Sequence, residues 1–369
     1  MKTHKRFLAL LLALALTFSL SACVSLPTKK STISRMTTTV ETGTETDSSA
    51  FSLSYEYDER GLASAIELTM DEELMGDDQK LRMELSYIMD DKGNPESVST
   101  LVLGMELRLA LENRYEGGRL TEAVITAFSM GDEALLGPGA SGSLAQEAAS
   151  AGAINLVLPV LQNYTGYRSC SLSIEGIGTV LRNEKGRAVY TYMPQAQLAT
   201  ETVTVYASDG GVMRTQNSYR IDGEEKELTM RTVTERDEKG FLRRMEIVNA
   251  DGSGAAVSLR LEDAGVSAEG RTQKRALVDT VTPIGDPDAW DASQDLDLEK
   301  LPGREFELYT LDEAGRVSVC RQNMLLDDQA DFFSETTTWY NARGEVTRTE
   351  TRNRSGEYSS RTVTETEYR

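Results

Sequence analysis

Residues 51–61, FSLSYEYDERG, contain the pattern that decides the fold. Large apolar side chains at 51, 53, 55 and 57 alternate with Ser and Glu, which is the period of a β-strand with one face on a core and the other in water. The alternation stops at Asp58-Glu59-Arg60-Gly61. Because Asp58 can accept hydrogen bonds from the turn backbone and Gly61 can take the left-handed conformation, these residues predict a type I hairpin turn with a G1 bulge.

The same alternation returns further along the chain. It is carried by Leu81, Met83, Leu85, Tyr87, Met89, Leu101, Leu103, Met105, Leu107, Leu109 and Leu111. Most of the residues between these positions are polar or small, so the pattern predicts antiparallel strands that are buried on one face.

A four-residue turn pattern recurs between the predicted strands. Each copy begins with Asp or Asn and ends with Gly, at 58–61, 90–93, 183–186, 237–240, 312–315 and 341–344. Looser versions occur at 116–118 and 208–211. We therefore predict an all-β protein: an antiparallel sheet of repeated long β-hairpins, arranged as a curved sheet or a sandwich. One short helical insert is expected near 143–160, where Ser143 can cap a helix that Pro159 ends or kinks.

Two of the turns, 57–62 (YDERGL) and 340–344 (YNARG), resemble in part the hairpin of YD-repeat proteins. The resemblance implies hairpin repeats that build extended β-sheet spirals or shells. It covers about half of the region expected to fold.

The N-terminus, MKTHKRFLALLLALALTFSLSAC, has a basic start, an apolar run and small residues before a cysteine. It resembles bacterial lipoprotein signals, and its lipobox is LSAC, residues 20–23. The resemblance implies a signal peptide over 1–22, a lipid on Cys23, and a mature protein held on the cell membrane and facing outside the cytoplasm. The alternative, a transmembrane anchor, needs about 20 apolar residues, more than this run provides.

Composition divides the rest of the chain. Residues 23–50 are rich in Ser and Thr and predict a lipidated, disordered tether. A hairpin-repeat region over 51–282 is followed by an acidic loop over 283–303 and by C-terminal β-hairpins over 304–369. The acidic loop holds weak calcium candidates, Asp286, Asp288, Asp291, Asp295 and Asp297, but their spacing does not match an EF-hand. A solvated acidic loop is the favoured interpretation.

Cys170 and Cys320 remain once Cys23 is assigned to the lipid. In a compartment where thiols oxidise, an even pair could form a disulfide. The alternative is two separately buried thiols that behave as small apolar side chains.

The only histidine, His4, lies in the predicted signal peptide, so histidine-based catalysis is unavailable to the mature chain. The chain has 39 basic and 59 acidic side chains and a formal net charge of −20, which disfavours nucleic acid as a partner. No cofactor and no catalytic residue is predicted.

These observations predict a membrane-anchored, non-catalytic binding or envelope-structural module whose partner is an envelope protein or a glycan. Two alternatives remain open. One is a hydrophobic-ligand carrier, in which a curved sheet with Met83, Met89 and Met105 encloses a lipid. The other, a minority hypothesis, is a glycan hydrolase that uses a pair of carboxylates. The oligomeric state is left open.

Overall fold

The structure of the 369-residue chain is a computed structural model. The residues that it describes are 33–43, 48–70, 80–102, 104–136, 160–161, 164–167, 170–174, 178–181, 187–193, 198–206, 211–222, 225–285, 301–322, 333–355 and 358–369. The chain divides into two compact units. Unit 1 comprises Met1–Val40, Ala50–Glu201 and Thr364–Arg369, and unit 2 comprises Glu41–Ser49 and Thr202–Val363.

Nearly every described residue of unit 1 lies in a strand. Its strands are β1 (Ile33–Gly43), β2 (Ser48–Tyr57), β3 (Ala63–Met70), β4 (Lys80–Glu84), β5 (Ser86–Met89), β6 (Pro95–Val102), β7 (Met105–Glu116), β8 (Arg119–Met130), β9 (Glu133–Leu136), β10 (Ser171–Ile174), β11 (Gly178–Leu181) and β12 (Arg187–Met193). A single 3-10 turn, η1 (Thr165–Tyr167), is assigned among the described residues.

Unit 2 is built from strands in the same way. They are β13 (Leu198–Tyr206), β14 (Val212–Asp222), β15 (Glu225–Arg236), β16 (Leu242–Asn249), β17 (Gly254–Val266), β18 (Thr272–Ile284), β19 (Glu305–Leu311), β20 (Val317–Gln322), β21 (Phe333–Tyr340), β22 (Val346–Ser355) and β23 (Tyr358–Tyr368). Strands β1, β2, β13 and β23 carry residues of both units.

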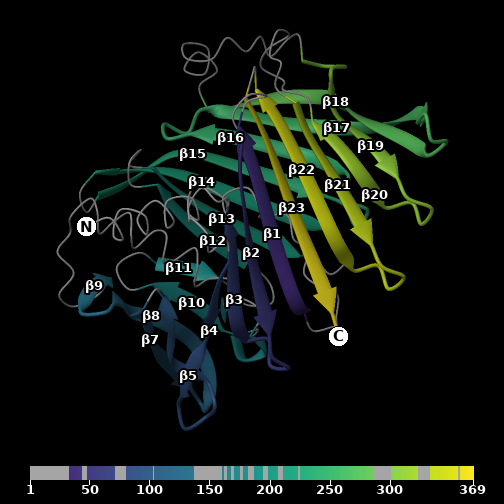
Figure 1. Cartoon of the computed structure of the whole chain (residues 1–369). Helices are drawn as coiled ribbons and strands as arrows, with labels where there is room; N and C mark the ends of the chain where they lie inside the picture. The colour runs from purple at the N-terminus through teal and green to yellow at the C-terminus, as the bar shows by residue number, and fades with distance from the viewer. Residues whose placement is uncertain are drawn as a thin grey trace. The chain divides into compact units, whose positions relative to one another are not determined.

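Each strand of unit 2 pairs with the next strand along the chain, as Figure 1 shows for β14 to β22. The pairs with a described register are antiparallel, so this part of the chain is a meander of consecutive hairpins. Together with the strands of unit 1, this confirms the prediction of an all-β protein made of repeated long antiparallel hairpins.

Among the pairs of unit 1 whose register is described, one is parallel. β8 and β10 run parallel, with Leu172 opposite Ala123. A parallel pair needs a crossover connection of a dozen or more residues, since the chain must return to the starting edge before the second strand. The stretch between β8 and β10, where the hairpin pattern breaks, supplies that length.

The predicted turns are present with their expected hydrogen bonds. Asp58 Oδ1 accepts from the backbone N–H of Arg60 at 2.9 Å and of Leu62 at 3.0 Å, and Gly61 has a φ of 78°. The same bonds recur at 90–93, 237–240, 312–315 and 341–344. The turn predicted at 183–186 lies outside the described residues. Two turns of related geometry, at 249–252 (NADG) and 267–270 (SAEG), were not predicted.

Alternation places the core of each unit on one face of its strands. In unit 1, the buried Leu53 and Tyr55 lie opposite Leu68 and Ile66 of the neighbouring strand. In unit 2, the core cluster consists of Phe241, Leu242, Met245, Val257, Leu259, Ala276, Val278, Leu301, Phe306, Tyr309 and Leu311. Burial of these apolar side chains is the main favourable term for the fold.

The prediction of a disordered tether over 23–50 is wrong over Ile33–Gly43, which forms β1, and over 48–50, where β2 begins. Met36 and Val40 are buried. β1 lies between β2 and β23 in the sheet. Thr38 Oγ1 is 3.2 Å from Thr364 Oγ1, and Ser34 Oγ donates to the Glu367 carbonyl at 3.1 Å. Local composition cannot reveal the pairing with β23, because that strand lies more than 300 residues away in the sequence.

Two other predicted segments are only partly described. Of the helical insert near 143–160 the structure describes Val160, which is helical and buried together with Leu161. The acidic loop over 283–303 joins β18 to β19, which pair directly and both belong to unit 2. The boundaries between the units therefore fall after Val40, Ser49, Glu201 and Val363 and not at the acidic loop.

Candidate binding surface

A groove of about 510 Å³ opens on unit 2. It is lined by the turn between β17 and β18 and by residues of β18 to β21, namely Val266, Ser267, Ala268, Glu269, Arg271, Gln273, Leu308, Thr310, Val319, Arg321 and Glu335. Ligand sites in proteins commonly have volumes of about 300–1,000 Å³. The groove is therefore large enough for a small ligand or for part of a longer one.

Strand register explains why these residues meet. Arg321 lies opposite Leu308 on one side and Glu335 on the other, so three adjacent strands contribute to one row. Thr310 and Val319 form part of the next row. On β19 the groove residues alternate with Glu307, Tyr309 and Leu311, which are buried. We call the groove side the open face of unit 2, since it is the face opposite the core.

The groove carries charge of both signs. Arg321 Nε donates to Glu335 Oε2 at 2.5 Å across β20 and β21. On the turn, a hydrogen bond from Ser267 lowers the pKa of Glu269, and the positive charges of Arg271 and Arg321 act in the same direction. Glu269 therefore stays ionised at neutral pH. The groove can offer guanidinium donors and carboxylate acceptors to a ligand at the same time.

Trp339 lies on the open face as well, four residues along β21 from Glu335. Residues two and four apart in a strand share a face, so Glu335 and Trp339 point to the same side. Trp339 is 41% exposed, and the guanidinium carbon of Arg348 lies 5.0 Å from the centroid of its ring. Arg348 is the register partner of Trp339 on β22.

Three arginines surround one carboxylate beside Trp339; we call Arg348, Arg352 and Arg361 the arginine cluster. Its members donate to Glu350 at 2.9 Å from Arg348 Nη2, 2.8 Å from Arg352 Nε and 2.9 Å from Arg361 Nε. The hydrogen bond from Arg361 is the largest of the influences that lower the pKa of Glu350 to about 2. Glu350 therefore holds the three guanidinium groups in place on the open face.

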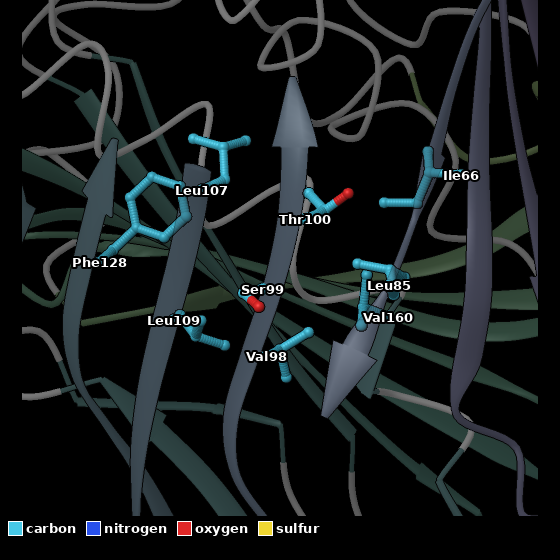
Figure 2. Close-up of a pocket in the computed structure, with 9 residues that line it drawn as sticks. All are labelled: Ile66, Leu85, Val98, Ser99, Thr100, Leu107, Leu109, Phe128 and Val160. Atoms are coloured by element: carbon cyan, nitrogen blue, oxygen red, sulfur yellow. The ribbon is translucent and has the colours of Figure 1, made fainter. Parts of the chain in front are cut away.

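Unit 1 has a small apolar pocket, shown in Figure 2 with its nine lining residues, Ile66, Leu85, Val98, Ser99, Thr100, Leu107, Leu109, Phe128 and Val160. Its volume is about 30 Å³. That is about the share of one molecule in liquid water, so the pocket does not hold an acyl chain. Met83, one of the methionines considered for lipid binding, is buried in the sheet opposite Ile66.

A polar cluster in unit 1 ties a hairpin tip to the segment that contains η1. Asp90 accepts hydrogen bonds from the Tyr115 hydroxyl and from Asn113 Nδ2, the latter at 3.0 Å. Tyr164 Oη donates to the Gly93 carbonyl at 3.0 Å and is 3.1 Å from Asn94 Oδ1. Burial and the bond to Asp90 raise the pKa of Tyr115 to about 12. These contacts stabilise the tip. The side chains that make them are hydrogen-bonded within the protein.

The predicted site residues have different outcomes. Cys23 and the calcium candidates Asp286, Asp288, Asp291, Asp295 and Asp297 lie outside the described residues. The structure contains no disulfide between Cys170 and Cys320. Cys170 is buried in unit 1, where burial raises the pKa of its thiol to about 12. Cys320 belongs to unit 2 and lies between Tyr309 and Thr336 of the adjacent strands.

Seven carboxyl groups of the described residues have a clearly shifted pKa, and each is shifted downward: Glu56, Asp90, Asp251, Asp263, Glu269, Asp312 and Glu350. The general acid of a glycoside hydrolase needs a raised pKa. These seven groups act as ionised partners and do not fit that role. Within the described ranges, no group of three or more His, Cys, Asp and Glu side chains could hold a metal ion.

Sequence reasoning missed the groove. Its SAEG turn at 267–270 was the one available signal, because Ser can replace Asp at the start of the turn. The row formed by Leu308, Arg321 and Glu335 had no local signal, since it depends on the register of three strands.

No protein-family model matches the chain, and no curated protein matches it either. Among solved structures, the chain is similar to a porin-like protein from Bacteroides vulgatus ATCC 8482, with 10% sequence identity, coverage of 92% of this chain and 99% of that chain, and a TM-score of 0.25. A porin-like protein from Bacteroides uniformis ATCC 8492 matches with 10% identity, 91% and 96% coverage, and a TM-score of 0.20. TM-scores of this size do not establish a common fold. In the part of the chain that the structure describes, no helix is long and apolar enough to cross a bilayer.

Proposed function

We propose that this chain is a lipid-anchored protein of the cell envelope that faces away from the cytoplasm and binds a partner, without catalysis, through the open face of unit 2. The groove of about 510 Å³ carries this proposal. It combines fixed charges of both signs with apolar positions at Leu308 and Val319. A partner that matches both would be bound and oriented.

The anchor rests on the lipobox LSAC and Cys23. Two acyl chains on one residue hold a protein on a membrane, because each buried methylene contributes about 0.8 kcal/mol. Cys23→Ala should move the protein from the membrane fraction to the soluble fraction. A mutant that stays on the membrane would contradict the anchor and leave the binding face to be tested separately.

The binding face is tested with the full-length chain in detergent as bait for envelope extracts. Arg321→Ala removes a guanidinium group that lines the groove, and it should reduce recovery of the partner. Arg114→Ala is a matched control, since Arg114 is a half-exposed arginine paired with Glu112 and Glu122 on a strand of unit 1. Equal recovery by both variants, or no recovered partner with the parent chain, would contradict the proposal.

A further inference from the structure

We propose that the ligand of the open face is a saccharide that carries an anionic group, and that it binds across Trp339 and the arginine cluster. This inference rests on the proposed function and names the chemistry of the partner. The proposed binding mode is more specific than a general polar contact, because it requires an aromatic platform and fixed cations together.

Trp339 provides the platform. Its indole ring is the largest apolar group among the exposed hydrophobic side chains of the described residues, the others being Ile88, Leu101, Leu198, Met213 and Val266. A pyranose ring presents a flat patch of C–H groups, which lose contact with water when they pack on an indole ring. The Arg348 guanidinium lies over one face of the ring, so the sugar would pack against the remaining exposed indole surface.

The arginine cluster provides the cations. Its three guanidinium groups share Glu350, and Glu41 lies 3.1 Å from Arg361 Nη1. The Arg352 side chain is 58% exposed and has donors that Glu350 does not use. A planar guanidinium can bind a carboxylate or a phosphate through two parallel hydrogen bonds.

The geometry favours a chain of sugars over a single sugar. Glu335 at the groove and Trp339 are four residues apart on one strand, which is about 13 Å at the rise of a β-strand. Thr337 lies between these ends on β21, and in the same register row Thr310 and Gln273 supply a hydroxyl and an amide in the groove, two and three strands away. Such groups pair with sugar hydroxyls, and the charged end of the ligand lies over the arginine cluster.

The test uses the full-length chain in detergent with Trp290→Phe, so that Trp339 is the sole tryptophan and its fluorescence reports the site. Tetragalacturonate and phosphorylated maltotetraose are titrated as carboxylate and phosphate probes, with cellotetraose as the neutral control. The acidic probes should change the fluorescence saturably, and the probe that binds more tightly identifies the anionic group. Cellotetraose should produce no saturable change.

Variants assign the roles. Arg352→Ala should weaken binding of the acidic probe by about tenfold or more, as expected for loss of a charge-assisted hydrogen bond. Trp339→Ala, measured by calorimetry, should abolish it, and Arg114→Ala should leave it unchanged. Arg352 is largely exposed, so this variant still tests the site if Trp339→Ala fails to fold.

The inference would be overturned if neither acidic probe binds, or if binding is insensitive to Arg352→Ala. Binding to phosphatidylglycerol vesicles in place of the saccharides would overturn it too and would identify a lipid surface as the partner. If Arg321→Ala still reduces partner recovery while no acidic saccharide binds, the proposed function stands and only this ligand class is wrong. Failure of both experiments would remove the proposed function as well.

Discussion

Arg236 and Glu307 form a bidentate ion pair across unit 2, with Arg236 Nη1 at 2.9 Å from Glu307 Oε2 and Nη2 at 2.6 Å from Oε1. The Glu307 side chain is 1% exposed. Tyr309 donates its hydroxyl proton to the same carboxylate and accepts the Leu242 N–H at 3.0 Å. Burial alone would lower the pKa of Arg236, but the charge and hydrogen bonds of Glu307 raise it. This pair connects the 237–240 turn to the core below the open face.

Arg236→Met should reduce the free energy of unfolding by about 3–5 kcal/mol at pH 7, because it leaves a buried carboxylate without its cation. The double variant Arg236→Met/Glu307→Leu should recover most of the loss. Urea unfolding measures the free energy of unfolding of both variants. Arg220→Met, at the exposed Arg220–Glu227 pair, is the control and should cost about 0–1 kcal/mol. A single variant as stable as this control would show that the pair contributes little.

The arginine cluster predicts a pH dependence of stability. Since Glu350 has a folded-state pKa of about 2, below its ordinary value of 4.5, its contribution is fully present above pH 4.5 and is lost as pH falls towards 2. Glu350→Gln should therefore be less stable than the parent at pH 7, by about 1.5–3 kcal/mol, and should approach it near pH 2. Thermal unfolding between these limits measures the difference. A constant difference across this range would contradict the pKa shift.

Strand β1 predicts that the chain close to the proposed lipid anchor contributes to folding. Met36→Ala removes a buried side chain and should cost about 2–5 kcal/mol in chemical denaturation. Met213→Ala, at a methionine that is 40% exposed, should cost much less. If residues 33–43 were a free tether, the two substitutions would have equally small effects.

The left-handed turn glycines can be tested at Gly315, which has a φ of 77° and no atom within 4 Å of an added Cβ. Gly315→Ala should cost about 1–2 kcal/mol from backbone conformation alone. Gly315→Asn should cost less, because asparagine adopts this conformation more readily. The thermal unfolding midpoints of the two variants measure these costs. An alanine variant at least as stable as the asparagine variant would contradict the left-handed conformation at Gly315.

Cys170 should resist alkylation in the folded protein, since its thiol is buried and its pKa is raised to about 12. Iodoacetamide treatment before and after denaturation, followed by peptide mapping, should label Cys170 only after unfolding. Recovery of a Cys170–Cys320 cross-linked peptide under non-reducing conditions would show that the two thiols pair.

The sequence by itself determined the local structure of this protein. Alternation at 51–57 and 105–111 specified strands, and Asp or Asn followed by Gly specified the turns, because both depend on residues within a few positions of one another. The alternation from 101 to 105 gave no sign of the turn that separates β6 from β7. The all-β class of the fold follows from these two signals.

Tertiary structure decided which strands meet. β1 pairs with β23 from the far end of the chain, the groove depends on the register of β19, β20 and β21, and the buried Glu307 is paired with an arginine 71 positions away. The physical reason is that burial and ion pairing act between residues that are close in space. A period-two pattern places a side chain on a face, but the partners on that face come from other strands.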